Sequence, residues 1–307
     1  MSQLSLQTQT KTLRLRVPYG ARTFSLSGSA VDESVVGAIE KAGGFWEPGV
    51  MSAISHFVRP GNVCLDIGAN IGVHTLVMSD LVGTGHVYAF EPSSNNYLHL
   101  LQNIRDNNVT NVTPVPLGLG NLIESRTFHY IPQFSGCSFA TRRADGLSVE
   151  QILERAWGSP LVNEIETVQF TTLDTWVAAA NIQRLDFIKM DVEGFERFVI
   201  EGGQTTFRKF EPVLVTEFNK NALTIYSEVS PESYYQVLTN IYPYLYDISQ
   251  IGKLKRVDNF AQLSNLLAGQ RFWADLLCAR SAINRTNVFS LSEQLLHRAN
   301  KLLKRLR

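Results

Sequence analysis

The stretch VCLDIGANIGVHTL, which runs from Val63 to Leu76, decides the fold of this chain. It begins with a β-rich apolar run, passes through an aspartate and two glycines, and continues into residues that favour a helix. A strand, a glycine-containing turn and a helix in this order are typical of the first unit of a nucleotide-binding α/β domain. The spacing of the glycines therefore bears on the kind of ligand.

The glycine turn does not have the spacing of a dinucleotide-binding fingerprint. That fingerprint reads G-x-G-x-x-G and places a pyrophosphate at a helix N-terminus, whereas this turn reads GANIG from Gly68 to Gly72. Asp66 stands two residues earlier, where its carboxylate would repel a pyrophosphate and attract a cation. S-adenosylmethionine carries an ammonium, a sulfonium and no phosphate. Gly68 is expected to let the backbone approach such a ligand, because a Cβ would intrude there.

A second acidic residue supports the same kind of ligand. Glu91 lies in YAFEPS, at the end of the next strand pattern and about one βαβ step after Asp66. A carboxylate in this place can accept hydrogen bonds from both hydroxyls of a ribose. Alone, Asp66 could be a helix N-cap and Glu91 a surface charge. Together they indicate a cofactor site at the carboxyl edge of a parallel sheet.

Strand and helix patterns alternate on both sides of the opening stretch. Strand patterns at 63–67, 86–90 and 112–117 enclose helical patterns at 73–81 and 95–107. Later strand patterns are LDFIKMDV, PVLVTEF, 244–248 and 274–279. Alternation at this spacing predicts an α/β fold with a doubly wound, mostly parallel sheet built from right-handed crossovers.

We divide the chain into three parts. Residues 1–50 are predicted to be an N-terminal extension with short helices, and residues 51–285 the main domain, in which a β-rich insertion at about 121–170 interrupts the alternation. Residues 286–307 predict a basic amphipathic helix with an apolar stripe that begins at Leu295. This helix could dock on its own domain, on a second subunit, or on a partner or membrane surface.

Composition argues against nucleic-acid binding, a disulfide framework and a membrane span. Lys plus Arg and Asp plus Glu both number 28, so the net charge is zero and no nucleic-acid binding is expected. The three cysteines are scattered, which argues against a disulfide framework and favours a reducing, cytoplasmic location. No secretory signal and no apolar run long enough to span a membrane are found in the sequence.

Four motifs in order resemble the FkbM-type methyltransferases, over roughly residues 40–220: VCLDIGANIGVHTL, VYAFEPS, TTLDTW and LDFIKMDVEGFE. The resemblance implies the class I, Rossmann-like fold with a seven-stranded sheet whose last strand is antiparallel. It implies S-adenosylmethionine as cofactor and methyl transfer commonly to oxygen. Residues that match the cofactor motifs are Asp66, Gly68, Asn70, Gly72 and Glu91. SGCS, from Ser135 to Ser138, resembles the family's small-residue G-x-S stretch, with Cys137 in the place of a glycine.

Three further carboxylates are candidates for work on the methyl acceptor. Asp191 and Glu193 follow the strand pattern LDFIKM, and Glu217 ends VLVTEF, so all three are predicted at the carboxyl edge of the sheet. One could remove the acceptor's proton, or the three could bind Mg²⁺, although a metal is not the favoured expectation. They could also hold a turn or form a solvated rim. His74 is expected to pack near the cofactor and Lys189 to be structural.

The sequence thus predicts an S-adenosylmethionine-dependent methyltransferase. The expected acceptor is a hydroxyl on a sugar, a glycan or lipid precursor, or a small natural product. Transfer to nitrogen is one alternative; where a DNA amino-methyltransferase would tend to carry an Asp/Asn-Pro-Pro-aromatic stretch, this chain reads DVEG from Asp191. A catalytically silent binding scaffold is the other alternative, and the intact cofactor motif argues against it.

Overall fold

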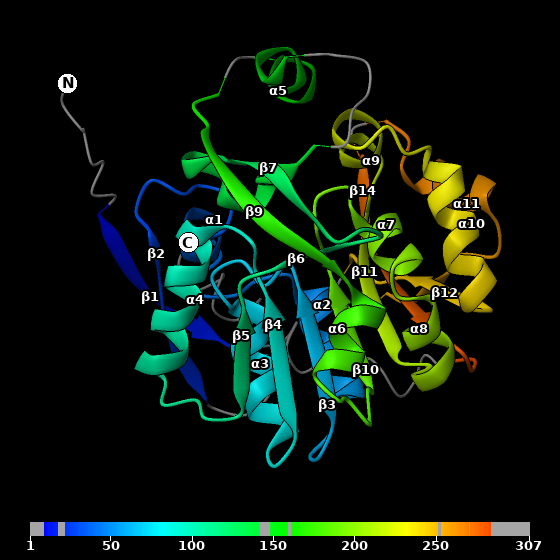
Figure 1. Ribbon diagram of the computed structural model, residues 1–307, viewed down its shortest axis with the longest axis horizontal. Helices are drawn as coiled ribbons and strands as arrows, with labels where there is room; N and C mark the ends of the chain where they lie inside the picture. Colours follow the sequence, from blue (N-terminus) through cyan, green and yellow to red (C-terminus); the bar gives the residue numbers. More distant parts are fainter. Residues whose placement is uncertain are drawn as a thin grey trace.

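The computed structural model describes residues 9–17, 22–141, 148–158, 161–250, 253–269 and 271–283. Its centre is an eight-stranded sheet with the order β13-β12-β14-β11-β10-β3-β4-β5 (Figure 1). The strands are β3 (Val63–Ile67), β4 (His86–Phe90), β5 (Val112–Val115), β10 (Phe187–Met190), β11 (Val213–Asn219), β12 (Tyr244–Asp247), β13 (Lys255–Arg256) and β14 (Trp273–Ala279).

The sheet has the direction pattern that the sequence predicted, with one strand more. Neighbours from β5 to β11 are parallel, and β14 runs antiparallel between β11 and β12. The expected number was seven. The eighth strand is the two-residue β13, which pairs with the outer edge of β12 and is exposed. Such a short charged strand blocks edge-to-edge pairing of sheets, and too few residues form it to give a strand pattern in the sequence.

Helices cover both faces of the main sheet. Successive strand residues point to opposite faces, so in β3 Cys64 joins one apolar core and Leu65 the other. The core around Cys64 includes α1 (Val36–Lys41), α2 (Pro48–Phe57) and α3 (Val73–Val82). The core around Leu65 includes α6 (Leu173–Ala179), α7 (Glu196–Glu201), α8 (Gln204–Phe210), α10 (Pro231–Ile241) and α11 (Phe260–Leu266). Helices α4 (Ser94–Asp106) and α9 (Lys220–Tyr226) complete the connections.

The insertion forms a sheet of its own. Its strand order is β6-β9-β7-β8, from β6 (Gly118–Gly120), β7 (Glu124–Tyr130), β8 (Phe139–Ala140) and β9 (Glu164–Thr172). A 3-10 helix (Pro132–Cys137) and α5 (Val149–Trp157) lie in the connections. Figure 1 shows this sheet standing over one end of the main sheet. It begins slightly before residue 121, the predicted start, because β6 already pairs with β9.

The N-terminal extension contains a hairpin that the sequence analysis missed. β1 (Thr10–Arg16) pairs antiparallel with β2 (Thr23–Ser29), and Leu15 and Phe24 face each other with almost no exposed surface. The predicted short helix is present as α1. The predicted C-terminal helix, residues 286–307, lies outside the described residues. Within the described ranges, no helix has the length and apolarity needed to cross a membrane.

Candidate functional site

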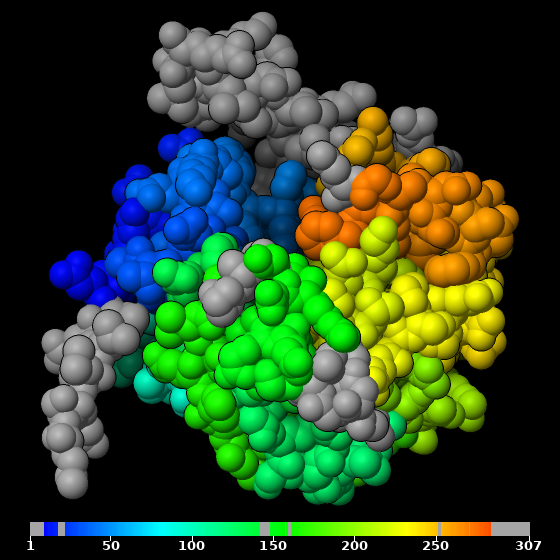
Figure 2. Space-filling view, turned by 90° about the horizontal axis from the view of Figure 1, so that it is seen from above, coloured from blue at the N-terminus to red at the C-terminus, as the bar shows by residue number. Residues whose placement is uncertain are grey.

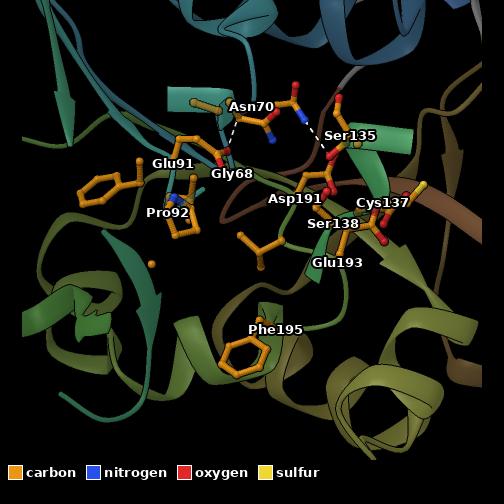
Figure 3. Close-up of a pocket in the computed structure, with 18 of the residues that line it drawn as sticks. Gly68, Asn70, Glu91, Pro92, Ser135, Cys137, Ser138, Asp191, Glu193 and Phe195 are labelled. Carbon is orange, nitrogen blue, oxygen red and sulfur yellow. Dashed lines mark hydrogen bonds between the residues drawn. The ribbon is translucent and has the colours of Figure 1, made fainter. Parts of the chain in front are cut away.

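One cavity collects most of the predicted site residues. It lies where the carboxyl ends of β3, β4, β10 and β11 meet the insertion sheet. Figure 2 looks onto this face, with the insertion (green) at its centre and the N-terminal segment (blue) beside it. The predicted residues that line the cavity are Gly68, Asn70, Glu91, Asp191, Glu193 and Glu217. Figure 3 shows Glu91 on one side of it and Asp191 with Glu193 on the other.

Gly68 marks the point where two strand ends cross. Its φ is +79°, and an added Cβ would lie 1.8 Å from the carbonyl oxygen of Asp191. Its N–H donates to the carbonyl of Phe90 at 3.0 Å, which ties the turn to the end of β4. The protein's own backbone therefore excludes a side chain at Gly68, and Gly68 also lines the cavity. Its close approach to a cofactor stays a prediction.

Glu91 is a buried carboxylate with both oxygens held in place. Oε2 accepts a hydrogen bond from the N–H of Asn70 at 2.8 Å, and Oε1 accepts one from the N–H of Ser93 at 2.9 Å. Burial raises the pKa of Glu91 to about 7, while these hydrogen bonds act in the opposite direction. Glu91 is thus a fixed hydrogen-bond acceptor whose charge changes near neutral pH.

Asn70 connects the glycine turn to the insertion. It adopts the left-handed region with a φ of +51°, where asparagine is one of the few tolerated side chains. Its Nδ2 donates to the carbonyl of Ser135 at 3.1 Å, and Figure 3 shows Asn70 between Glu91 and Ser135. The predicted small-residue stretch therefore forms part of the same wall as the turn.

Two residues predicted to bind the cofactor do not line the cavity. Asp66 is fully buried in β3, where Oδ2 accepts a hydrogen bond from Oγ1 of Thr75 at 2.6 Å and Oδ1 lies 4.0 Å from Nζ of Lys189. Gly72 begins α3 with a φ of +91°, and a Cβ there would lie 2.6 Å from the Leu100 side chain. The structure gives both residues a role in shaping the turn.

Three predicted carboxylates come together on the opposite side. Asp191, Glu193 and Glu217 each offer an oxygen, and these oxygens all lie within 4.8 Å of one another. Parallel strands place Asp191 and Glu217 at neighbouring ends, and Glu193 reaches the same place through a left-handed backbone with a φ of +50°. This backbone conformation is unfavourable for a glutamate, and such strain is concentrated at functional sites.

Burial and mutual repulsion disfavour full ionisation of these carboxylates. Burial raises the pKa of Glu193 and of Glu217 well above the usual value, and the charge of Asp191 adds to the rise. Burial also raises the pKa of Asp191, but there the nearby Lys189 ammonium opposes the rise. Asp191 is thus the member of the group best able to keep its charge.

Lys189 is the buried cation of the site. Its Nζ lies 3.4 Å from Oδ2 of Asp191 and 3.3 Å from the carbonyl oxygen of Gly68. Burial disfavours the charge, but Asp191, Asp66 and Glu47 together raise the pKa of Lys189 above its usual value. The lysine is therefore held as an ammonium between Asp66, which lies in β3, and Asp191, which follows β10.

The N-terminal extension supplies site residues that sequence reasoning missed. Ser34, Trp46 and Glu47 line the cavity. Asp32 is 2% exposed, and its carboxylate accepts from the N–H of Ser135 at 3.1 Å and the hydroxyl of Ser135 at 2.9 Å. Asp32 thereby holds the small-residue loop against the cavity. No local sequence pattern marks these residues, since their partners lie far along the chain.

Comparisons with known proteins point to one family. The sequence pattern of the Methyltransferase FkbM domain matches residues 66–243. The chain is 28% identical over 141 residues to Methyltransferase 1 of Beauveria bassiana, which covers 45% of this chain and 57% of that protein. It is 27% identical over 195 residues to the 2-O-methyltransferase NoeI of Sinorhizobium fredii, which covers 60% of this chain and 69% of that protein.

Solved structures give a weaker likeness. A crystal structure of a methyltransferase FkbM from Methylobacillus flagellatus is similar with a TM-score of 0.41 and 16% sequence identity. The similar region covers 71% of this chain and 43% of that chain. The chain thus spans less than two thirds of the length of both this structure and the Beauveria bassiana relative.

Proposed function

The chain belongs to the FkbM methyltransferase family, and we propose that it transfers a methyl group from S-adenosylmethionine to a hydroxyl oxygen. The proposed acceptor is a sugar, a glycan or lipid precursor, or a small natural product. The observation that carries this proposal is one cavity with carboxylates on two sides. Glu91 lies on one side and suits a ribose, and Asp191, Glu193 and Glu217 lie together on the other and suit the molecule that receives the methyl group. A relative named as a 2-O-methyltransferase supports oxygen as the acceptor atom.

The Glu91 side of the cavity fits a ribose. Both oxygens of Glu91 are fixed by backbone N–H groups, and each carboxylate oxygen can accept a second hydrogen bond. The side-chain oxygen of Asn96, which lines the same cavity, is buried and has no hydrogen-bond partner among the described residues. A ribose brings hydroxyl donors for such acceptors. The apolar side chains of Phe90 and Leu117 line the cavity as well and suit an adenine ring.

The bound cofactor supplies an electrophilic methyl group, and the protein has to orient and deprotonate the acceptor. We assign the proton transfer to Asp191. A raised pKa makes its carboxylate a better base, and Lys189 at 3.4 Å keeps it charged. Glu193 and Glu217 carry protons more readily, so they can exchange hydrogen bonds with the hydroxyl groups of the acceptor.

A divalent cation is not part of the proposed reaction. Asp191, Glu193 and Glu217 have the ligand chemistry of Mg²⁺, which would supply a Lewis acid if it were bound. Lys189 competes for the same carboxylate, because its ammonium lies 3.4 Å from Oδ2 of Asp191. We expect EDTA to leave turnover unchanged; a loss that Mg²⁺ restores would replace the base with a metal site.

Domain division and location are part of the proposal. We propose residues 1–50 as the extension and 51–285 as the catalytic domain with its insertion. We propose 286–307 as a segment for contacts with its own domain, a second subunit, a partner or a membrane surface. The three cysteines are free thiols, which supports a cytoplasmic location.

A screen of candidate acceptors tests the proposed function. The protein is incubated with S-adenosylmethionine and sugars, glycan precursors and small alcohols, and the products are examined by mass spectrometry for the gain of one CH₂. Fragmentation then locates the new methyl group. Methylation at oxygen is the expected result. Methylation at nitrogen would correct the acceptor class, and cofactor binding without any product would support the silent scaffold.

A further inference from the structure

A second pair of polar side chains, the half-buried Glu47 and the buried His74, lines the cavity and has no part in the proposed reaction. Oε2 of Glu47 lies 3.2 Å from Nε2 of His74. Glu47 directly precedes α2, and His74 lies in the first turn of α3. Both residues line the cavity, and His74 is 5% exposed. Glu47 lies before residues 66–243, which match the family domain.

The conformation of Glu47 indicates that its position matters. Its φ is +30°, a left-handed conformation that costs a glutamate free energy. Burial alone would raise the pKa of Glu47, but the adjacent His74 imidazole and the Lys189 ammonium bring this pKa below the usual value. Glu47 thus presents an ionised carboxylate at the wall of the cavity, where it can accept a hydrogen bond from a positively charged ligand group.

The other carboxylates near the cavity already have partners or assigned tasks. Asp66, which the sequence analysis expected to attract the cationic part of the cofactor, is enclosed by Thr75 and Lys189 and does not line the cavity. Glu91 binds two backbone N–H groups at the end of β4, and Asp191 pairs with Lys189 at the end of β10. Among the described carboxylates that line the cavity, Glu47 is the one to which the proposed reaction gives no task.

Resting on the proposed function, we propose that Glu47, oriented by His74, binds the ammonium group of the methionyl arm of S-adenosylmethionine. A sulfonium has three substituents, and three groups of acidic residues line the cavity. Glu91 at the end of β4 takes the ribose, and the carboxylates after β10 and in β11 take the acceptor beside the methyl group. Glu47 and His74, on the side of α2 and α3, remain for the third substituent.

In this proposal, the N-terminal extension contributes to the selectivity of the site for its cofactor through Glu47. A charge-assisted hydrogen bond in a buried site is worth roughly ten- to a hundredfold in affinity. The extension would therefore distinguish a ligand with an amino-acid arm from one without it. His74 is a positioning residue here, since it acts through the carboxylate of Glu47.

Two ligands that differ only at this arm test the proposal. S-adenosylhomocysteine keeps the amino-acid arm, whereas 5′-methylthioadenosine lacks it. Both are titrated by calorimetry into the wild-type protein and into Glu47→Gln, His74→Leu and His74→Gln. Glu47→Gln should weaken S-adenosylhomocysteine roughly ten- to a hundredfold and leave 5′-methylthioadenosine unchanged. His74→Leu should give a smaller loss of the same selectivity, and His74→Gln should restore it, since its amide can still donate to Glu47.

Controls distinguish a failure of the role proposed for Glu47 from a loss of folding and from a failure of the proposed function. Retained binding of 5′-methylthioadenosine shows that a variant is folded. Glu91→Ala should weaken both ligands, and Glu40→Gln, an exposed change on α1, should weaken neither. Equal weakening of both ligands by Glu47→Gln and His74→Leu, or no effect of either, overturns the role of Glu47. Failure of the wild-type protein to bind either ligand would instead contradict the proposed function.

Discussion

The two sides of the cavity differ in how completely the protein satisfies them. On one side, Glu91 receives hydrogen bonds from Asn70 and Ser93 to its two oxygens. On the other, Oε2 of Glu217 is buried without a partner, and no ion pair reaches Glu193 or Glu217 within the described part of the chain. The Glu91 carboxylate is held in place before a ligand arrives, whereas the carboxylates of the second side need a proton or a ligand donor. We expect this difference to separate the proposed cofactor side from the proposed acceptor side.

The largest effect is expected from Asp191→Asn, which would sharpen the contrast between the two sides. The change keeps the volume and removes the charge that accepts the acceptor's proton. Turnover should fall by roughly 10²–10⁴ while S-adenosylhomocysteine binding holds. Single-turnover kinetics and calorimetry on the same preparation measure both quantities. As a control, Asp258→Asn removes a surface carboxylate paired with Arg256 and should leave both unchanged. Full activity of Asp191→Asn would leave the base unidentified.

The next effect concerns the backbone contact that joins the two sides. In Gly68→Ala, the Cβ would lie 1.8 Å from the Asp191 carbonyl oxygen, in a left-handed conformation. The free energy of unfolding should fall by about 2–5 kcal/mol. Gly61→Ala is a matched control, since Gly61 has a φ of +83° and nothing within 4 Å of an added Cβ. It should cost only about 1–2 kcal/mol in chemical denaturation. Equal losses would mean that the contact with Asp191 is unimportant.

Glu91→Ala tests only the side of the cavity that is proposed to bind the cofactor. The variant removes the acceptor proposed for both ribose hydroxyls, so cofactor affinity should fall by about 1.5–3 kcal/mol, roughly ten- to a hundredfold. The fold should survive, because Glu91 follows the end of β4. Calorimetric titration with S-adenosylhomocysteine measures the loss, and circular dichroism checks the fold. Binding as tight as that of the wild type would make Glu91 a structural residue.

The smallest effect is a pH dependence. Burial raises the pKa of Glu91 to about 7, so acidification below this pH protonates the carboxylate that accepts the ribose hydroxyls. Affinity for S-adenosylhomocysteine should fall between pH 8 and 6, by at most about tenfold per pH unit. The difference between the wild type and Glu91→Gln isolates this effect. A wild-type affinity that follows the same curve as Glu91→Gln would exclude Glu91 as its source.

The ligand-free protein should respond to pH in the opposite sense. Because the folded state raises the pKa of Glu91, folding favours the protonated form. The stability that this residue contributes is fully present below its unfolded pKa and is lost as the pH rises through about 7. Thermal unfolding of the free protein at several pH values, compared with Glu91→Gln, measures this contribution.

Parts of the fold and site that depend on local signals were predictable from sequence. The strand patterns and the acidic residues that follow or end them, Glu91, Asp191 and Glu217, lie at one edge because parallel strands share their carboxyl ends. The turn at Gly68 was also predictable, because a glycine in this place of the sequence marks a turn.

Parts that depend on distant contacts were not predictable. Asp32 reaches Ser135 across 103 positions, and Glu47 meets His74 only because α2 packs against α3. Asp66 was placed beside the ligand, yet the alternation of side chains along β3 turns it towards Thr75. The β1–β2 hairpin escaped notice because its strands are rich in polar residues.

Calorimetric titration of the wild-type protein with S-adenosylhomocysteine and, separately, with NAD tests the central claim most directly. The glycine turn lacks the dinucleotide spacing, and the cavity is lined by carboxylates, which disfavour a pyrophosphate. We predict saturable binding of S-adenosylhomocysteine with one site per chain and no heat of binding for NAD. Tight binding of NAD with no response to S-adenosylhomocysteine would contradict the account.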